Sequence, residues 1–188
     1  MRFEVRHEYA ASVEEVVAVL TDFASMREKY ESLGQSGVEL VERDEAEDGS
    51  VTVTTRRVVP LELPGFASNF LSPRQTVIQT DTWSAADVHG VRTGTFAVQA
   101  KGAPVKVSGT MRLEPDGPRG CVDEMSINVE CKVPLVGGKL ADFVGGDTRK
   151  AVDHEQTWVA AHLAGRHAGG ARGPSKRGST AARPSRRR

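Results

Sequence analysis

The sequence of 188 residues predicts an α+β fold, in which a curved antiparallel sheet of about seven strands wraps around one long C-terminal helix. Three observations predict this fold. A short alternating strand and two short helices come first, a series of strands with short connections follows, and an amphipathic helix over residues 135–163 comes last. One helix packed across one face of such a sheet leaves room for a cavity between the two layers.

The beginning of the chain predicts the first strand and the two short helices. Apolar and charged side chains alternate over residues 2–9, which is typical of a half-buried strand. Ser12 and Glu15 have the spacing of a capping box at the start of a helix. The sequence from Ser25 repeats this signature, so we expect a second helix, capped by Ser25, that ends before Gly34.

The middle of the chain predicts consecutive strands joined by turns rich in Gly, Pro and Asp. These strands are expected at residues 38–43, 51–59, 74–83, 91–100, 105–113 and 121–133. Residues 61–73 read as an apolar, proline-containing connector. Glycines inside strands often mark bulges, so Gly94 and Gly109 are expected to bend the sheet.

The last helix carries an apolar stripe from Leu140 to Leu163, which Gly145-Gly146 interrupts. These glycines predict either a kink or a close approach to the sheet. Residues 165–188 contain eight basic residues, no acidic residue and many Gly, Ala, Ser and Pro, so we expect a disordered basic tail. Residues 1–164 form the predicted domain, which is acidic, with 17 basic and 25 acidic side chains.

Charge and cysteine usage predict a cytoplasmic protein. Residues 2–8 are too charged for a signal peptide, and no apolar run approaches the ~20 residues of a membrane span. Cys121 and Cys131 lie on one predicted strand, about 33 Å apart at 3.3 Å per residue, which is too far for a disulfide. We therefore expect intracellular thiols that serve as small core residues.

The segment Lys132–Phe143, followed by Glu155 and Trp158, resembles an uncharacterised bacterial family, domain of unknown function 2505. That family is placed in the START-like (SRPBCC) helix-grip superfamily, together with polyketide cyclases, plant pollen-allergen proteins and lipid-transfer domains. The resemblance covers roughly residues 1–163. It implies a helix-grip fold and a hydrophobic cavity, and it supplies no catalytic residues, because the shared motif is structural.

The apolar faces of the sheet and of the last helix predict the lining of this cavity. The expected apolar ligand-binding residues are Val105, Val107, Met111, Met125, Ile127, Val129, Val144, Ala151 and Trp158. The expected polar ones are His7, Tyr9, Asp147 and His154. His7 is alternatively a core histidine, and Asp147, His154 and Glu155 alternatively lie at a solvated helix edge or pair with Arg56, Arg57 or Arg74.

No motif in the sequence specifies a reaction. His154 and His162 are not spaced as a helical metal site requires, and no dinucleotide, phosphate-loop or nucleophile-elbow pattern occurs, so neither metal nor cofactor is expected. The predicted function is non-catalytic binding of a small hydrophobic ligand or lipid. One alternative is a polyketide cyclase or hydratase that uses His7 and Tyr9, and another is a cavity-poor interaction module.

The expected partners follow from the same features. We expect no specific nucleic acid and no integral membrane contact. The basic tail of residues 165–188 could make weak contacts with anionic surfaces.

Overall fold

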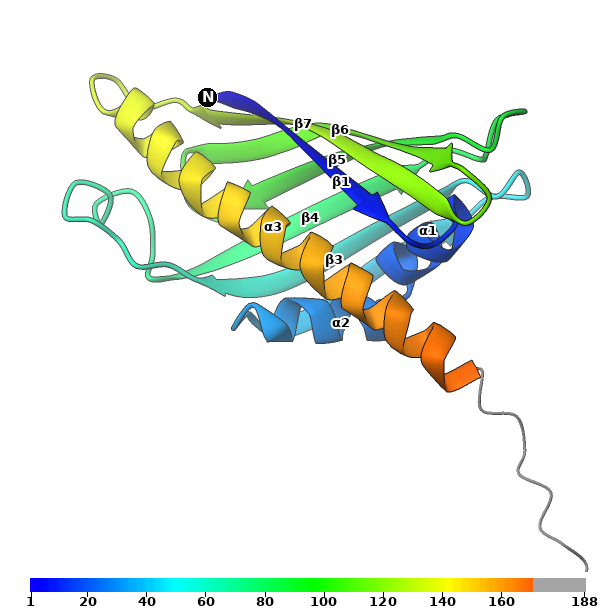
Figure 1. Ribbon diagram of the computed structural model, residues 1–188. Coiled ribbons are helices and arrows are strands. Elements are labelled where there is room, and N and C mark those ends of the chain that lie inside the picture. Colours follow the sequence, from blue (N-terminus) through cyan, green and yellow to red (C-terminus); the bar gives the residue numbers. More distant parts are fainter. Residues whose placement is uncertain (171–188) are drawn as a thin grey trace, which may run out of the picture.

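The computed structural model describes residues 1–170, in which a seven-stranded antiparallel sheet is crossed by one long helix (Figure 1). The strand order is β1-β7-β6-β5-β4-β3-β2. In chain order the elements are β1 Arg2–Tyr9, α1 Val13–Thr21, α2 Phe23–Ser32, β2 Ser36–Glu45, β3 Val51–Pro60, β4 Arg74–Trp83, β5 Arg92–Ala100, β6 Val105–Asp116, β7 Gly120–Cys131 and α3 Gly137–Gly170. The predicted fold class, with its two short helices after the first strand, is confirmed.

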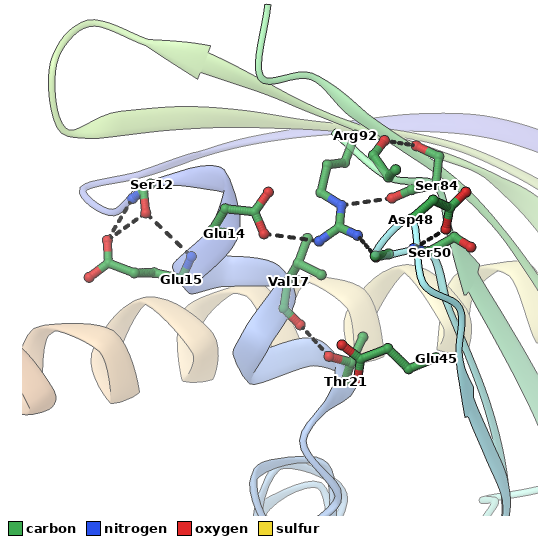
Figure 2. A network of polar contacts seen from close by, with 12 residues as sticks. Ser12, Glu14, Glu15, Val17, Thr21, Glu45, Asp48, Ser50, Ser84 and Arg92 are labelled. Atoms are coloured by element: carbon green, nitrogen blue, oxygen red, sulfur yellow. Dashed lines mark hydrogen bonds and ion pairs between the residues drawn. The ribbon is translucent and has the colours of Figure 1, made fainter. Parts of the chain in front are cut away.

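The two short helices begin at different kinds of cap. Ser12 and Glu15 form the predicted capping box of α1, in which the Glu15 carboxylate accepts a hydrogen bond from the Ser12 N–H at 2.9 Å (Figure 2). The predicted cap of α2 is wrong. Asp22 holds that position, and its carboxylate accepts hydrogen bonds from the N–H and the hydroxyl of Ser25, both at 2.8 Å. Because α2 begins at Phe23, Ser25 lies inside its first turn.

Gly94 and Gly109 do not form the predicted bulges. Both lie in regular register between β5 and β6, and the register shifts of the sheet lie between β2 and β3 instead. A Cβ atom at Gly109 would overlap the carbonyl oxygen of Ser126 and would lie 2.6 Å from a ring carbon of Phe96. Glycine is therefore required at this position because backbone and an aromatic ring pack directly against it.

Gly145 of α3 packs against the Met1 side chain, and a Cβ atom there would overlap the Met1 sulfur, although this flexible side chain can shift, unlike the backbone beside Gly109. This glycine lets the beginning of the chain pack against the helix, which agrees with the predicted close approach. The helix continues to Gly170, beyond its predicted end at Leu163, so residues 165–170 are helical and do not belong to a disordered tail. Residues 171–188 of the predicted tail lie outside the described residues. Within residues 1–170, none of the helices combines the length and the apolar character that crossing a membrane requires.

Arg92 ties α1 to the sheet (Figure 2). Its guanidinium is buried, and it donates hydrogen bonds to the carbonyl oxygen of Ser84 at 2.7 Å, to the Glu14 carboxylate at 3.0 Å and to the carbonyl oxygen of Gly49. Three separate segments thus meet on one side chain: the helix α1, the turn between β2 and β3, and the end of β4. The Arg92 side chain therefore joins α1 to the sheet at the end where α1 lies.

Candidate functional site

A cavity of 480 Å³ lies between the inner face of the sheet and α3, with α2 and the loop of residues 61–73 completing its wall. Sites for small molecules commonly have volumes of about 300–1,000 Å³, so this cavity is large enough for one. Much of the wall is aliphatic, with contributions from Leu61, Leu71, Val77, Val98, Val105, Val107, Val144 and Val152. Phe66 of the loop packs edge-on against Phe143 of α3, with the ring centroids 6.5 Å apart, so this loop contacts the helix.

Nine of the residues expected from the sequence line this cavity. They are Tyr9, Val105, Val107, Met111, Met125, Val144, Asp147, Ala151 and His154. His154 is exposed on the helix, and its Nε2 lies 3.2 Å from the Ser32 hydroxyl. The structure brings these side chains together around one cavity, some from the sheet and the others from α3. Their role in binding a ligand stays a prediction.

His7, Ile127, Val129 and Trp158 do not line the cavity, contrary to the expectation. The reason is the placement of α3, which packs on β7 and β1 and so fills that side of the sheet. Ile127 and Val129 are therefore fully buried core residues, 0% and 1% exposed. Most of the strand residues that line the open volume lie on β3 to β6, and the others are Tyr9 of β1 and Asp123 and Met125 of β7.

The other two residues outside the cavity have local partners. Trp158 stacks on His162 of the same helix, with ring centroids 4.7 Å apart. His7 packs edge-on against Tyr9 at 4.6 Å, and burial lowers the pKa of its imidazole. Its Nε2 is buried without a hydrogen-bond partner among the described residues. His7 is thus half-buried outside the cavity, and no described residue satisfies its Nε2 as expected for a core histidine.

One end of the cavity is polar, which the sequence analysis did not anticipate. Lys29 of α2 is 4% exposed, and its ammonium lies 2.8 Å from the Glu155 carboxylate of α3. Burial is the largest single influence and opposes the charge, but Glu155, Tyr30 and Asp81 together outweigh it and keep the pKa of Lys29 above its usual value. Glu155 therefore pairs with Lys29, not with Arg56, Arg57 or Arg74 as one alternative expected.

Arg57 is also buried in this polar end, and its partners are neutral. It donates hydrogen bonds of 2.6 Å to the side-chain oxygens of Gln35 and Gln79, and its guanidinium lies 3.9 Å from the ring centre of Tyr30. The Gln79 amide in turn donates to both carboxylate oxygens of Asp81, at 2.8 and 3.0 Å. Burial raises the pKa of Asp81. The Gln79 amide thus bridges the guanidinium and the carboxyl group.

Asp123 of β7 differs from these groups because its hydrogen-bonding capacity is not filled. The residue is 5% exposed and lines the cavity. Its Oδ2 accepts a long hydrogen bond of 3.5 Å from Gln156, and its Oδ1 is buried without a partner among the described residues. Burial raises the pKa of Asp123 to about 6. Burial and the Asp123 charge raise the pKa of the nearby Tyr9 hydroxyl, which stays protonated.

The alternation of the strands already contains a signal for two of these residues. Asp123 lies two positions before Met125, and Asp81 lies two positions before Trp83, so both carboxylates face the same side as their apolar neighbours. A charged side chain at an inward-facing position is unusual and points to a partner or a ligand. Arg57 gives a third such signal, because it alternates with Val53 and Thr55 on the buried face of β3, whereas Lys29 lies on a helix and carries no such signal.

Comparison with known proteins agrees with this fold. A profile of the family described as "Protein of unknown function (DUF2505)" matches residues 4–163, as the resemblance of Lys132–Phe143 implied. An uncharacterised protein of Mycobacterium tuberculosis is 26% identical in an alignment of 163 residues that covers 84% of this chain and 93% of that protein.

Three solved structures are similar in fold at low sequence identity. The protein TTHA0849 from Thermus thermophilus has a TM-score of 0.63 at 14% identity, covering 88% of this chain and 99% of that one. The Zhui aromatase/cyclase from Streptomyces sp. R1128 has a TM-score of 0.58 at 14% identity, covering 89% and 95%. A START superfamily protein from Mycobacterium smegmatis has a TM-score of 0.52 at 16% identity, covering 86% and 95%. The fold is that of the START-like helix-grip superfamily.

Proposed function

This chain belongs to the DUF2505 family of proteins of unknown function, and we propose that it binds one small hydrophobic molecule or lipid in its cavity without catalysing a reaction. The observation that carries the proposal is the cavity of 480 Å³ with its largely aliphatic wall. Affinity would come from burial of apolar surface, at roughly 25 cal/mol per Å². The proposal includes the cytoplasmic location expected from the sequence, which the free thiols of Cys121 and Cys131 support within the described residues.

Filling the cavity tests this function. Ala151 lines the cavity from α3, so the indole of Ala151→Trp would project into the open volume. We expect the variant to fold with nearly unchanged stability and to lose binding of a neutral fluorescent probe, N-phenyl-1-naphthylamine. In a fully packed core the same substitution would cost on the order of 1–3 kcal/mol.

Ala161→Trp is the matched control, because Ala161 is exposed on the same helix and does not line the cavity. This variant should bind the probe as the unmodified protein does. Native mass spectrometry of freshly purified protein would complement the titration by detecting a co-purified lipid. The proposal fails if the unmodified protein binds no apolar probe and Ala151→Trp is strongly destabilised.

The polar end of the cavity favours a second candidate function, a cyclase or hydratase. Of the two residues considered for acid–base chemistry, Tyr9 lines the cavity and His7 does not, but Asp123 lies near Tyr9. A protonated hydroxyl and a carboxyl with a raised pKa are groups that general acid–base catalysis can use. Once a ligand has been identified, incubating it with the protein decides between the two functions. An enzyme would change the mass or structure of the ligand, and a carrier would leave it unchanged.

The third alternative is a cavity-poor interaction module that binds a partner by the sheet surface or the tail. The cavity between sheet and α3 supports ligand binding over that alternative. Ligand binding therefore remains the leading function.

A further inference from the structure

Asp123 lies in the cavity wall, and no described residue fills its hydrogen-bonding capacity. We propose that Asp123 receives a hydrogen-bond-donating group, a hydroxyl or a protonated amine, at one end of an otherwise apolar ligand. This inference rests on the proposed function, since it assigns the chemical class of the molecule that the cavity binds.

The first step of the argument is the unfilled hydrogen-bonding capacity of Asp123. A carboxylate accepts several hydrogen bonds, and buried carboxylates in folded proteins are almost always paired. Here the side chain is 5% exposed, one oxygen has a single long hydrogen bond to Gln156, and the other has none among the described residues. Because the residue lines the cavity, a ligand bound there lies beside this carboxylate.

The second step is that the other charged groups at the polar end already have partners. Lys29 is paired with Glu155, and Arg57 is held by Gln35 and Gln79. Beside Asp123, an anionic ligand would have to displace one of these contacts and would lie near the Asp123 charge; Lys150, a further basic residue that lines the cavity, is exposed on α3. A donor ligand needs no displacement, so the arrangement favours a hydroxyl or an ammonium over a carboxylate.

The third step places the rest of the ligand. Asp123 lies near the beginning of β7, whereas Val105 of β6 pairs with Cys131 at the opposite end of that strand. Val105 belongs to the aliphatic part of the wall, together with Val98 and Val144. A ligand whose polar end meets Asp123 would therefore extend its apolar body along the strands toward this part of the cavity.

The buried hydroxyl of Tyr30 also has no hydrogen-bond partner among the described residues, but Tyr30 does not line the cavity. A ligand in the cavity therefore meets the unfilled group at Asp123 and not the one at Tyr30. This difference singles out Asp123 as the recognition residue.

The test uses three amphiphiles that share one alkyl chain and differ in their head groups: decylamine, decanol and decanoate. Each displaces N-phenyl-1-naphthylamine from the full-length protein at about pH 7.5. We expect decylamine and decanol to displace the probe at concentrations at least about tenfold lower than decanoate does. In Asp123→Asn, which keeps the shape of the side chain and loses its charge, the advantage of decylamine over decanoate should fall by about tenfold or more. Asp153→Asn, an exposed position on α3, should leave the order of the three unchanged.

The possible results separate this inference from the proposed function. If the probe binds but decanoate displaces it as well as decylamine does, or if Asp123→Asn leaves the preference intact, the assignment of Asp123 is wrong. The proposed binding of a hydrophobic ligand in the cavity then still stands. If the unmodified protein binds neither the probe nor any of the three amphiphiles, the proposed function fails and this inference fails with it. If Asp123→Asn does not fold, the head-group order measured with the unmodified protein decides.

Discussion

Asp123→Asn should stabilise the protein at neutral pH and much less in acid. Burial raises the pKa of the Asp123 carboxyl to about 6, compared with its ordinary value of 3.8. Between these two pH values the folded protein holds a proton that the unfolded chain has released. The free energy of unfolding therefore falls as the pH rises through this window, because the folded state ends with a charged, buried carboxylate.

The magnitude follows from the two pKa values. Their difference corresponds to about 3 kcal/mol once the pH is well above both. The amide of Asp123→Asn does not titrate, so the variant escapes this loss. Relative to the unmodified protein, its free energy of unfolding should increase by about 2 kcal/mol between about pH 4.5 and about pH 7.5.

The groups that face Asp123 come from several elements and are the same in both proteins. Tyr9 of β1, Lys29 of α2 and Gln156 of α3 interact with Asp123, and the exposed Glu124 of β7 acts on it only through its charge. Burial is the largest cause of the raised pKa, the Gln156 amide and the Lys29 charge oppose it, and the Glu124 charge adds to it. The raised pKa values of Tyr9 and Lys29 keep both groups protonated between pH 4.5 and 7.5, and the Gln156 amide does not titrate, so these three neighbours add little to the difference between the two proteins.

Urea unfolding at the two pH values, followed by tryptophan fluorescence, measures the difference. Trp83 lies at the cavity and is buried, so its emission should report global unfolding. Asp153→Asn, at an exposed position on α3, is the control and should change the free energy of unfolding little at either pH. An Asp123→Asn variant that shows the same stability difference at both pH values, or a larger gain in acid, would refute the assignment of a buried, uncompensated carboxyl.

Two further substitutions test the packing around the cavity. Lys29→Met should lower the free energy of unfolding by about 3 kcal/mol, because it leaves the Glu155 carboxylate without its partner. Adding Glu155→Gln should restore part of this loss. If Lys29→Met alone is as stable as the unmodified protein in urea, this reasoning is wrong. Gly109→Ala should lower the stability in thermal unfolding by about 2 kcal/mol, because its methyl group meets the backbone of β7. Gly138→Ala in α3 should be neutral or slightly stabilising, because a Cβ atom there has nothing within 4 Å. Equal effects of the two substitutions would argue against the close packing at Gly109.

The elements themselves could be predicted because their signals are local. The alternation over residues 2–9, the capping box at Ser12 and the apolar stripe of α3 each reflect the geometry of a single strand or helix. The errors arose where two local signals competed. Asp22 and Ser25 are both good caps, and the choice between them depends on where α2 begins. Gly94 and Gly109 suggested bulges, but close packing of neighbouring strands explains at least Gly109 without one.

The sequence by itself determined which residues of each strand face inward, because side chains alternate with a period of two. It did not determine which of the inward-facing residues meet open space, since that depends on the place where α3 crosses the sheet. The helix packs on β7 and β1, so Ile127 became core while Met125 kept access to the cavity. The pairing of Lys29 with Glu155 and the unfilled oxygen of Asp123 were likewise decided by tertiary structure, because they depend on contacts between elements far apart in the chain.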